Sequence, residues 1–150
     1  MPRKATVLAP TGGPVIEIGP TTTRVLAADE DTDGRCSVYE VTVPRRFPGP
    51  PAHVHTDRAH AFYVLDGTVQ LTIGHETVHA SAGTFVYIPP GLAHTFGSAG
   101  DARGRLLAFD TPGGWERYLR EMASTFPAGT PVDPVRTAQV MARHDTRAAP

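Results

Sequence analysis

The sequence predicts an all-β fold, a jelly-roll barrel followed by one or two C-terminal α-helices. Short runs rich in β-branched and aromatic residues recur at roughly ten-residue intervals up to position 110, which is typical of sandwiches and barrels. Fifteen glycines and fifteen prolines lie mostly between these runs, where they favour turns. No helical periodicity separates the runs, and this excludes a parallel α/β fold.

The strand runs divide into an N-terminal pair and a longer series. Residues 15–18 and 23–27 flank a Gly-Pro turn and should pair with each other. The stretch 36–43 alternates apolar and polar residues, as a half-buried strand does. The later runs are 61–65, 69–73, 76–80, 85–88, 93–96 and 105–110. We expect the first two of these to form a hairpin that turns at Asp66 and Gly67.

After Thr111 the periodicity becomes helical. The apolar residues on one predicted helix face are Trp115, Leu119, Met122, Ala123 and Phe126. This helix should pack on the barrel, with Trp115 contributing to packing rather than to a pocket. Asp133 and Pro134 are typical of the N-cap and first residue of a second helix that runs to about Arg143. The polar tail beyond it is expected to be mobile.

Length and charge limit the classes of function. The 150 residues predict one domain, 1–150, with a barrel at about 15–110 and a helical segment at about 115–143. A net charge of −1 without a dense Lys/Arg cluster argues against nucleic acid or a membrane surface as partner and favours a small molecule. The single cysteine, Cys36, and the lack of a signal-peptide pattern or long apolar run predict a soluble, cytoplasmic protein.

Four histidines lie at spacings that suit one metal ion held inside a barrel: His53, His55, His60 and His94. His53 and His55 are two residues apart in an extended segment, so their imidazoles share a face. His60 directly precedes the next predicted strand, 61–65, and His94 follows the turn at 89–91. Because neutral imidazole binds transition metals, the cluster predicts one divalent transition metal and not calcium or magnesium. The other three histidines lack a partner at ligand spacing and should be solvated: His75, His79 and His144.

Strand parity predicts an apolar pocket beside this cluster. Residues that alternate with the histidines along the strands should share their inward face. Parity places Phe62, Val64 and Phe96 on the predicted wall, and Tyr39 and Leu71 are added to it from other strands. Tyr63, between two inward residues, should point outward. Such a wall suits a flat, partly aromatic substrate, although each residue could equally be part of an ordinary core.

The two histidine-bearing segments resemble the two motifs of the cupin superfamily. Residues 47–67 contain the H-x-H pair of the first motif, and residues 83–98 match the second. The resemblance implies a double-stranded β-helix barrel with a metal held by the motif histidines. Three positions depart from the pattern: Phe47 stands for the opening glycine, Ser98 for the closing asparagine, and His60 for the glutamate of most metal cupins.

The histidine at position 60 changes the predicted chemistry. Four neutral imidazoles would leave the full charge on a divalent ion and make it a stronger Lewis acid than a site with three histidines and one glutamate. No Asp or Glu of the two motifs is expected on the inward face. A metal-bound hydroxide is therefore the first candidate for the general base.

The four histidines, the small single domain and the helix that begins within residues 111–116 resemble the aromatic polyketide cyclases of actinobacteria. That resemblance implies Zn2+, with Fe2+, Ni2+ and Mn2+ as alternatives, and an intramolecular aldol condensation of a poly-β-keto substrate, free or carried by an acyl carrier protein. A homodimer is also expected. Two other functions fit the fold: a quercetinase-like metal-dependent dioxygenase and a binding module without turnover.

Overall fold

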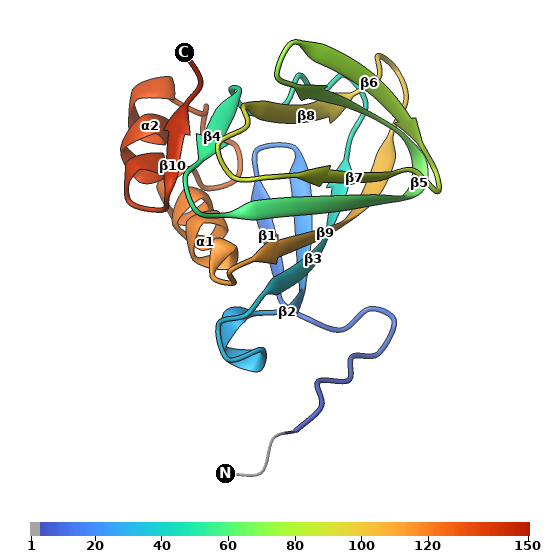
Figure 1. The fold of residues 1–150 in the computed structure, drawn as a ribbon, viewed down its shortest axis with the longest axis vertical. Helices are drawn as coiled ribbons and strands as arrows, with labels where there is room; N and C mark the ends of the chain where they lie inside the picture. The colour runs from blue at the N-terminus through green and yellow to red at the C-terminus, as the bar shows by residue number, and fades with distance from the viewer. Residues whose placement is uncertain (1–3) are drawn as a thin grey trace.

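A ten-stranded sheet wraps into a jelly-roll barrel with two helices at one side in the computed structural model, which describes residues 4–150 (Figure 1). The strands are β1 (Val15–Ile18), β2 (Thr21–Ala27), β3 (Ser37–Val43), β4 (His53–His55), β5 (Ala59–Ile73), β6 (Glu76–Ser81), β7 (Phe85–Ile88), β8 (His94–Ser98), β9 (Gly104–Thr111) and β10 (Thr146–Ala148). The helices are α1 (Trp115–Thr125) and α2 (Pro134–Ala142), with a short 3-10 turn, η1 (Asp29–Asp31). The predicted fold class is confirmed.

All strand pairs are antiparallel and follow the order β1-β2-β3-β9-β5-β8-β4-β10. The remaining strands, β6 and β7, both pair with β5. The long strand β5 therefore belongs to both layers of the barrel: its first half pairs with β7 and β9, and its second half pairs with β6 and β8. This sharing brings the histidine-bearing ends of β4, β5 and β8 into one region.

The predicted hairpin between 61–65 and 69–73 is wrong, because β5 runs without interruption from Ala59 to Ile73. Gly67 adopts a φ of 68°, and a Cβ there would lie 2.0 Å from the carbonyl oxygen of Arg103. The register of the β5–β9 ladder also shifts between Val64 and Asp66. The Asp-Gly pair thus marks a bend at which the strand passes from one layer to the other, and not a reversal of the chain.

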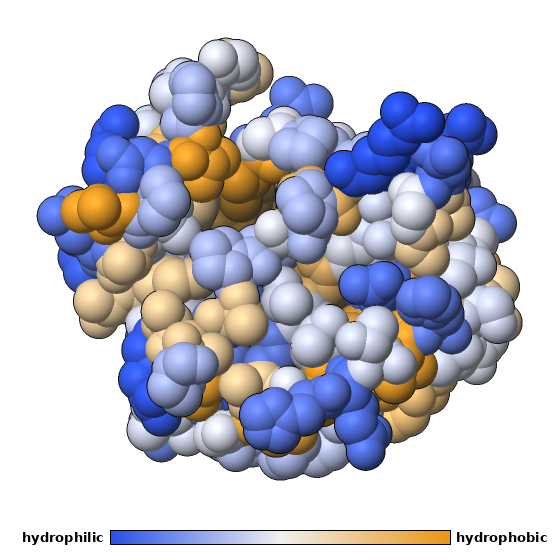
Figure 2. Space-filling view, turned by 90° about the horizontal axis from the view of Figure 1, so that it is seen from above, coloured by the Kyte–Doolittle hydropathy of each residue, from blue (hydrophilic) through white to orange (hydrophobic). Residues whose placement is uncertain are grey.

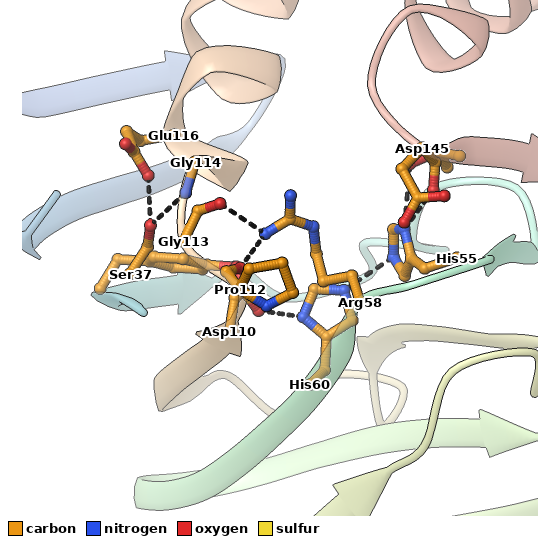
Figure 3. Close-up of polar contacts among 12 residues, drawn as sticks. Ser37, His55, Arg58, His60, Asp110, Pro112, Gly113, Gly114, Glu116 and Asp145 are labelled. Atoms are coloured by element: carbon orange, nitrogen blue, oxygen red, sulfur yellow. Dashed lines mark hydrogen bonds and ion pairs between the residues drawn. The ribbon is translucent and has the colours of Figure 1, made fainter. Parts of the chain in front are cut away.

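Helix α1 packs on the barrel as its periodicity predicts. Trp115, Tyr118 and Met122 are buried and belong to the same hydrophobic cluster as the barrel core, which Phe126 also joins just after the helix. Glu116 is fully buried and accepts hydrogen bonds from the Ser37 hydroxyl and from the Asp29 backbone (the contact with Ser37 is drawn in Figure 3). Neither helix of the described chain is long and apolar enough to cross a membrane.

The second helix begins where the sequence predicts, but the tail after it does not behave as expected. The Asp133 side chain caps α2 by accepting from the Val135 N–H at 2.7 Å. The tail was expected to be mobile; instead residues 146–148 form β10, which pairs with β4, and the Ala149 N–H donates to Ala52. Without β10, strand β4 would be an open sheet edge. In Figure 1 the C-terminus accordingly lies beside β4.

The outer face of β5, β7 and β9 carries exposed aromatic rings. As strand parity predicts, Tyr63 points outward, with 44% of its surface exposed, whereas Phe62 is 6% exposed. Phe85, Tyr87 and Phe109 are also exposed on neighbouring positions of β7 and β9. The homodimer expected from the resemblance stays a prediction.

Two phenylalanines allow the same substitution to be compared in the core and on the surface. Phe126 is 1% exposed and Phe85 is 63% exposed. We expect Phe126→Ala to lower the free energy of unfolding by about 3–5 kcal/mol, because it leaves a cavity between α1 and the barrel. Phe85→Ala should change it by no more than about 0.5 kcal/mol. Urea denaturation of both variants measures the difference, and equal losses would contradict the packing of α1 described above.

Candidate metal centre

The four histidines of the motifs lie together at one end of the barrel. His53 and His55 come from β4, His60 from β5 and His94 from β8, and each is no more than 6% exposed. The pairing of β4 with β8 sets His53 directly opposite His94, with ring centroids 4.6 Å apart. The rings of His55 and His60 are 4.5 Å apart. The H-x-H spacing on β4 and the pairing of β4 with β8 explain why His53, His55 and His94 lie together.

The outward nitrogen of each imidazole has a hydrogen-bond acceptor. His53 and His94 each donate from Nδ1 to the carbonyl oxygen two residues earlier, at 2.9 Å. His55 donates from Nδ1 to the carbonyl oxygen of Asp145 at 3.2 Å. A carbonyl oxygen can only accept, so Nδ1 carries the proton in these three rings and Nε2 keeps its lone pair.

The inward Nε2 atoms fit a metal ion. Within the described chain, Nε2 of His94 is buried without a hydrogen-bond partner. Nε2 of His55 lies 2.7 Å from Nε2 of His60, so two lone pairs would face each other unless a cation or a proton lies with them. His53, His55 and His94 each offer a ligand atom within 4.8 Å of the other two, and they could hold a metal ion. That group does not include His60, whose ligation stays a prediction.

His60 is held by a carboxylate that the motif reasoning missed. Its Nδ1 donates to Asp110 Oδ1, and the hydroxyl of Tyr39 donates to the other oxygen of the same carboxylate; Figure 3 shows Asp110 facing His60. Asp110 is fully buried on β9, directly opposite His60 on β5. Asp110 lies outside the two motifs to which the expectation of no inward carboxylate applied, so the barrel supplies a carboxylate that the motifs do not. Alternate residues of 105–110 face inward, as the buried Leu106 and Ala108 show. The same alternation in the sequence could have placed Asp110 on the inward face.

This carboxylate changes the electrostatics inferred from the sequence. Asp110 adds one negative charge beside the imidazoles, so the positive charge of a bound ion would be partly balanced through His60. Burial, and then the charge of Asp110, raise the pKa of Tyr39 well above its ordinary value. Tyr39 therefore remains a hydrogen-bond donor to Asp110 at any physiological pH.

Burial keeps the other three imidazoles neutral. It lowers the pKa of His53 to about 4, that of His94 to about 3 and that of His55 to about 2. Neighbouring histidines add to this effect at all three rings, since protonated rings would repel one another. Neutral rings leave their lone pairs free for a metal at neutral pH.

A cavity of about 410 Å³ opens beside the cluster. Three of the residues predicted to line it do so, namely Tyr39, Phe62 and Phe96, as do His53, His60 and His94. Val64 and Leu71 instead lie in the core, at most 1% exposed, and do not line it. No Asp, Glu, Lys or Arg of the described chain is among the lining residues. The face seen in Figure 2 is hollowed, with hydrophobic residues visible in its depth between hydrophilic ones.

Trp115 lines this cavity, although the sequence favoured a packing role for it alone. Its ring lies edge-on to His55, with centroids 4.7 Å apart, and stacks on Tyr118 at 4.1 Å. The guanidinium of Arg58 lies 5.6 Å from the Trp115 ring and donates to the carbonyl oxygens of residues 112 and 113 (Figure 3). These contacts hold the loop between β4 and β5 against the start of α1.

The three remaining histidines lie outside the cluster. His75 and His79 are exposed, as expected. His144 is not solvated as predicted, because its Nε2 contacts Glu121 on α1 at 2.5 Å and its ring packs against Tyr118. The tail that carries it folds back onto the barrel, which the local sequence did not indicate.

The buried neutral histidines predict a pH dependence of stability for the metal-free protein. Between pH 6.5, the ordinary pKa of histidine, and about pH 4, the unfolded chain binds protons at His53, His55 and His94 that the folded chain does not bind. The free energy of unfolding should therefore decrease as the pH falls through this range. Urea midpoints measured with chelator present test this, and the slope should be shallower in His55→Gln/His94→Gln. A parent midpoint that stays constant from pH 7 to pH 4.5 would rule out the buried neutral rings.

Comparison with known proteins locates the family resemblance in the barrel. Residues 39–110 match the family model of the cupin domain. An uncharacterised protein of Streptomyces coelicolor is 33% identical over 51 residues, which is 34% of this chain and 49% of that protein. The chain thus matches about half the length of that curated relative.

Solved structures share the fold at low sequence identity. KdgF from Halomonas sp. superimposes with a TM-score of 0.66 at 13% identity, over 76% of this chain and 99% of that one. Streptomyces PAC13, solved with uridine, superimposes with a TM-score of 0.60 at 17% identity, over 78% of this chain and 88% of that one. A cupin-like protein from Thermotoga maritima superimposes with a TM-score of 0.57 at 21% identity, over 65% of this chain and 72% of that one. Residues 39–110 thus match the cupin domain in sequence, and the strand order and these solved structures show that the chain has the same fold.

Proposed function

We propose that this protein is a metal-dependent aromatic polyketide cyclase, which closes a poly-β-keto intermediate by intramolecular aldol condensation. The observation that carries the proposal is the uncharged, aromatic cavity that opens directly onto three histidines of the cluster. The sequence resemblance to the actinobacterial cyclases, in particular that of the resistomycin pathway, points to the same chemistry. Cyclase activity would require a site that folds a long neutral chain and polarises one of its carbonyl groups.

The cavity suits a neutral, flat substrate. Its volume of about 410 Å³ lies within the range of small-molecule sites, which is about 300–1,000 Å³. Apart from the proposed metal, the described residues of the wall offer no cation for a carboxylate or a phosphate group, so the wall itself favours a neutral substrate over a sugar acid or a nucleotide. The rings of Phe62, Phe96 and Trp115 can contact the face of a forming aromatic system and exclude water.

The side chains of the site have separable roles. A divalent metal held by His53, His55 and His94, with His60 as proposed fourth ligand, would supply Lewis-acid polarisation of a carbonyl oxygen. The Asp110 carboxylate holds His60 in one orientation, and Tyr39 holds Asp110. Burial raises the pKa of Tyr118 to about 12, so its phenol stays protonated and can donate to a substrate oxygen in the cavity.

The proposed metal is Zn2+, with Fe2+, Ni2+ and Mn2+ as alternatives. Neutral imidazole suits all four ions, and Zn2+ has no redox chemistry that would compete with an aldol closure. The polyketide is proposed to arrive free or attached to an acyl carrier protein. Neither nucleic acid nor a membrane surface is proposed as a partner, because the net charge of −1 gives neither an electrostatic attraction.

Metal content gives the first test. We expect one metal ion per chain in the purified protein and less than a tenth of that in His53→Ala/His94→Ala, because two of the three grouped ligands are removed. His75→Ala/His79→Ala removes two exposed histidines and serves as the matched control, with metal content equal to the parent. Elemental analysis after gel filtration measures all three proteins. Full occupancy in the His53→Ala/His94→Ala variant would place the metal elsewhere.

Activity is tested without oxygen, because an aldol condensation changes the mass of the product only by loss of water. The metal-loaded protein is incubated anaerobically with a minimal polyketide synthase, and product masses are compared with those from the same mixture with His53→Ala/His94→Ala. We expect a cyclised product, lighter by one or more waters, only with the parent protein. Unchanged products without oxygen, together with oxygen incorporation in air, would reject the cyclase in favour of a quercetinase-like dioxygenase.

A further inference from the structure

The last strand of the chain contacts the histidine cluster from outside the matched cupin domain. Strand β10 pairs with β4 so that Thr146 lies opposite His55 and Ala148 lies opposite His53. The family match ends at residue 110, so this contact is not part of the matched domain. Thr146 is buried, with 5% of its surface exposed.

Thr146 and Asp145 together bind the outward side of the His55 ring. Nδ1 of His55 lies 3.0 Å from the Thr146 hydroxyl oxygen and 3.2 Å from the Asp145 carbonyl oxygen. The Thr146 hydroxyl donates its own proton to the carbonyl of His144 at 3.0 Å, so its oxygen accepts from His55. Whereas His53 and His94 use carbonyls two residues away, His55 depends on acceptors about ninety positions along the chain.

The segment that provides these acceptors is fixed on both sides. The Asp145 carboxylate accepts from the backbone N–H groups of Thr56 and Asp57, at 3.1 and 2.9 Å, and so organises the turn that follows His55. On the other side, His144 contacts Glu121 of α1. Figure 3 shows His55 between Asp145 on one side and His60 on the other. A ring held in this way can neither flip nor exchange its tautomer without breaking two hydrogen bonds.

We propose that β10 is a functional part of the metal centre, with Thr146 as a positioning residue that, together with the Asp145 carbonyl, orients His55 and keeps its proton on Nδ1, so that Nε2 faces the proposed metal. The inference rests on the proposed function only in requiring a metal at the histidine cluster. It assigns a determinant of metal affinity to a segment outside the cupin domain. Loss of the Thr146 hydroxyl should weaken metal binding without removing any ligand.

The test measures the affinity for Zn2+ alone, by competition with a chromophoric chelator. Thr146→Val keeps the shape of the side chain but cannot accept from His55, and we expect the Kd to rise about 10- to 100-fold. Thr146→Ser keeps the hydroxyl and should stay within about threefold of the parent. The control is Arg147→Ala, an exposed side chain on the same strand, which should bind as the parent does. With Co2+ in place of Zn2+, the visible absorption bands should shift in Thr146→Val alone.

Unfolding of the metal-free proteins separates positioning from a general loss of structure. Thr146→Val, or Thr146→Ala if the valine is poorly packed, should unfold within a few degrees of the parent while its affinity falls. Equal Zn2+ affinity in the parent and in a folded Thr146→Val or Thr146→Ala would overturn the inference and leave the proposed function standing. A parent protein that binds none of Zn2+, Fe2+, Ni2+ and Mn2+ would overturn both.

Discussion

The candidate centre depends on hydrogen bonds made on the outer side of its imidazole rings. Each histidine donates from Nδ1 to an acceptor in the surrounding barrel, and this leaves Nε2 as the only atom with which the ring can bind an ion. Two of the acceptors are local carbonyls, one is a carboxylate on β9, and one set comes from the C-terminal segment. The inward geometry of the cluster is therefore a property of four separate parts of the fold.

The burial of the rings, in turn, determines what can approach them. Burial lowers the pKa of three histidines, and among residues 4–150 no charged side chain lines the cavity. Asp110 is the carboxylate that contacts the cluster, and it lies behind His60 with Tyr39 as its second partner. Charge is thus placed on the protein side of the histidines, while the cavity side presents aromatic rings. This separation favours a substrate that is neutral and flat over one that is ionic.

Much of the fold and part of the site followed from local pattern. Period-two alternation, turn residues and the H-x-H pair depend on neighbours in the chain, so strands, helices and the position of His53 and His55 could be inferred directly. Asp66 and Gly67 could not be interpreted in the same way, because a bend and a hairpin need the same backbone freedom. Asp110 and Thr146 were missed for a different reason: each contacts a histidine at least fifty residues away, and the sequence alone does not specify which strands pair.

Strand β5 carries a further consequence for how this chain can vary. Its residues alternate between two environments, with His60 facing the cavity and the small Ala61 facing the outer surface, and the strand is anchored in both layers of the barrel. Insertion of a single residue between His60 and the bend at Gly67 would reverse this alternation, placing an imidazole on the outside and an alanine at the cavity. The number of residues between these two positions is therefore fixed by geometry.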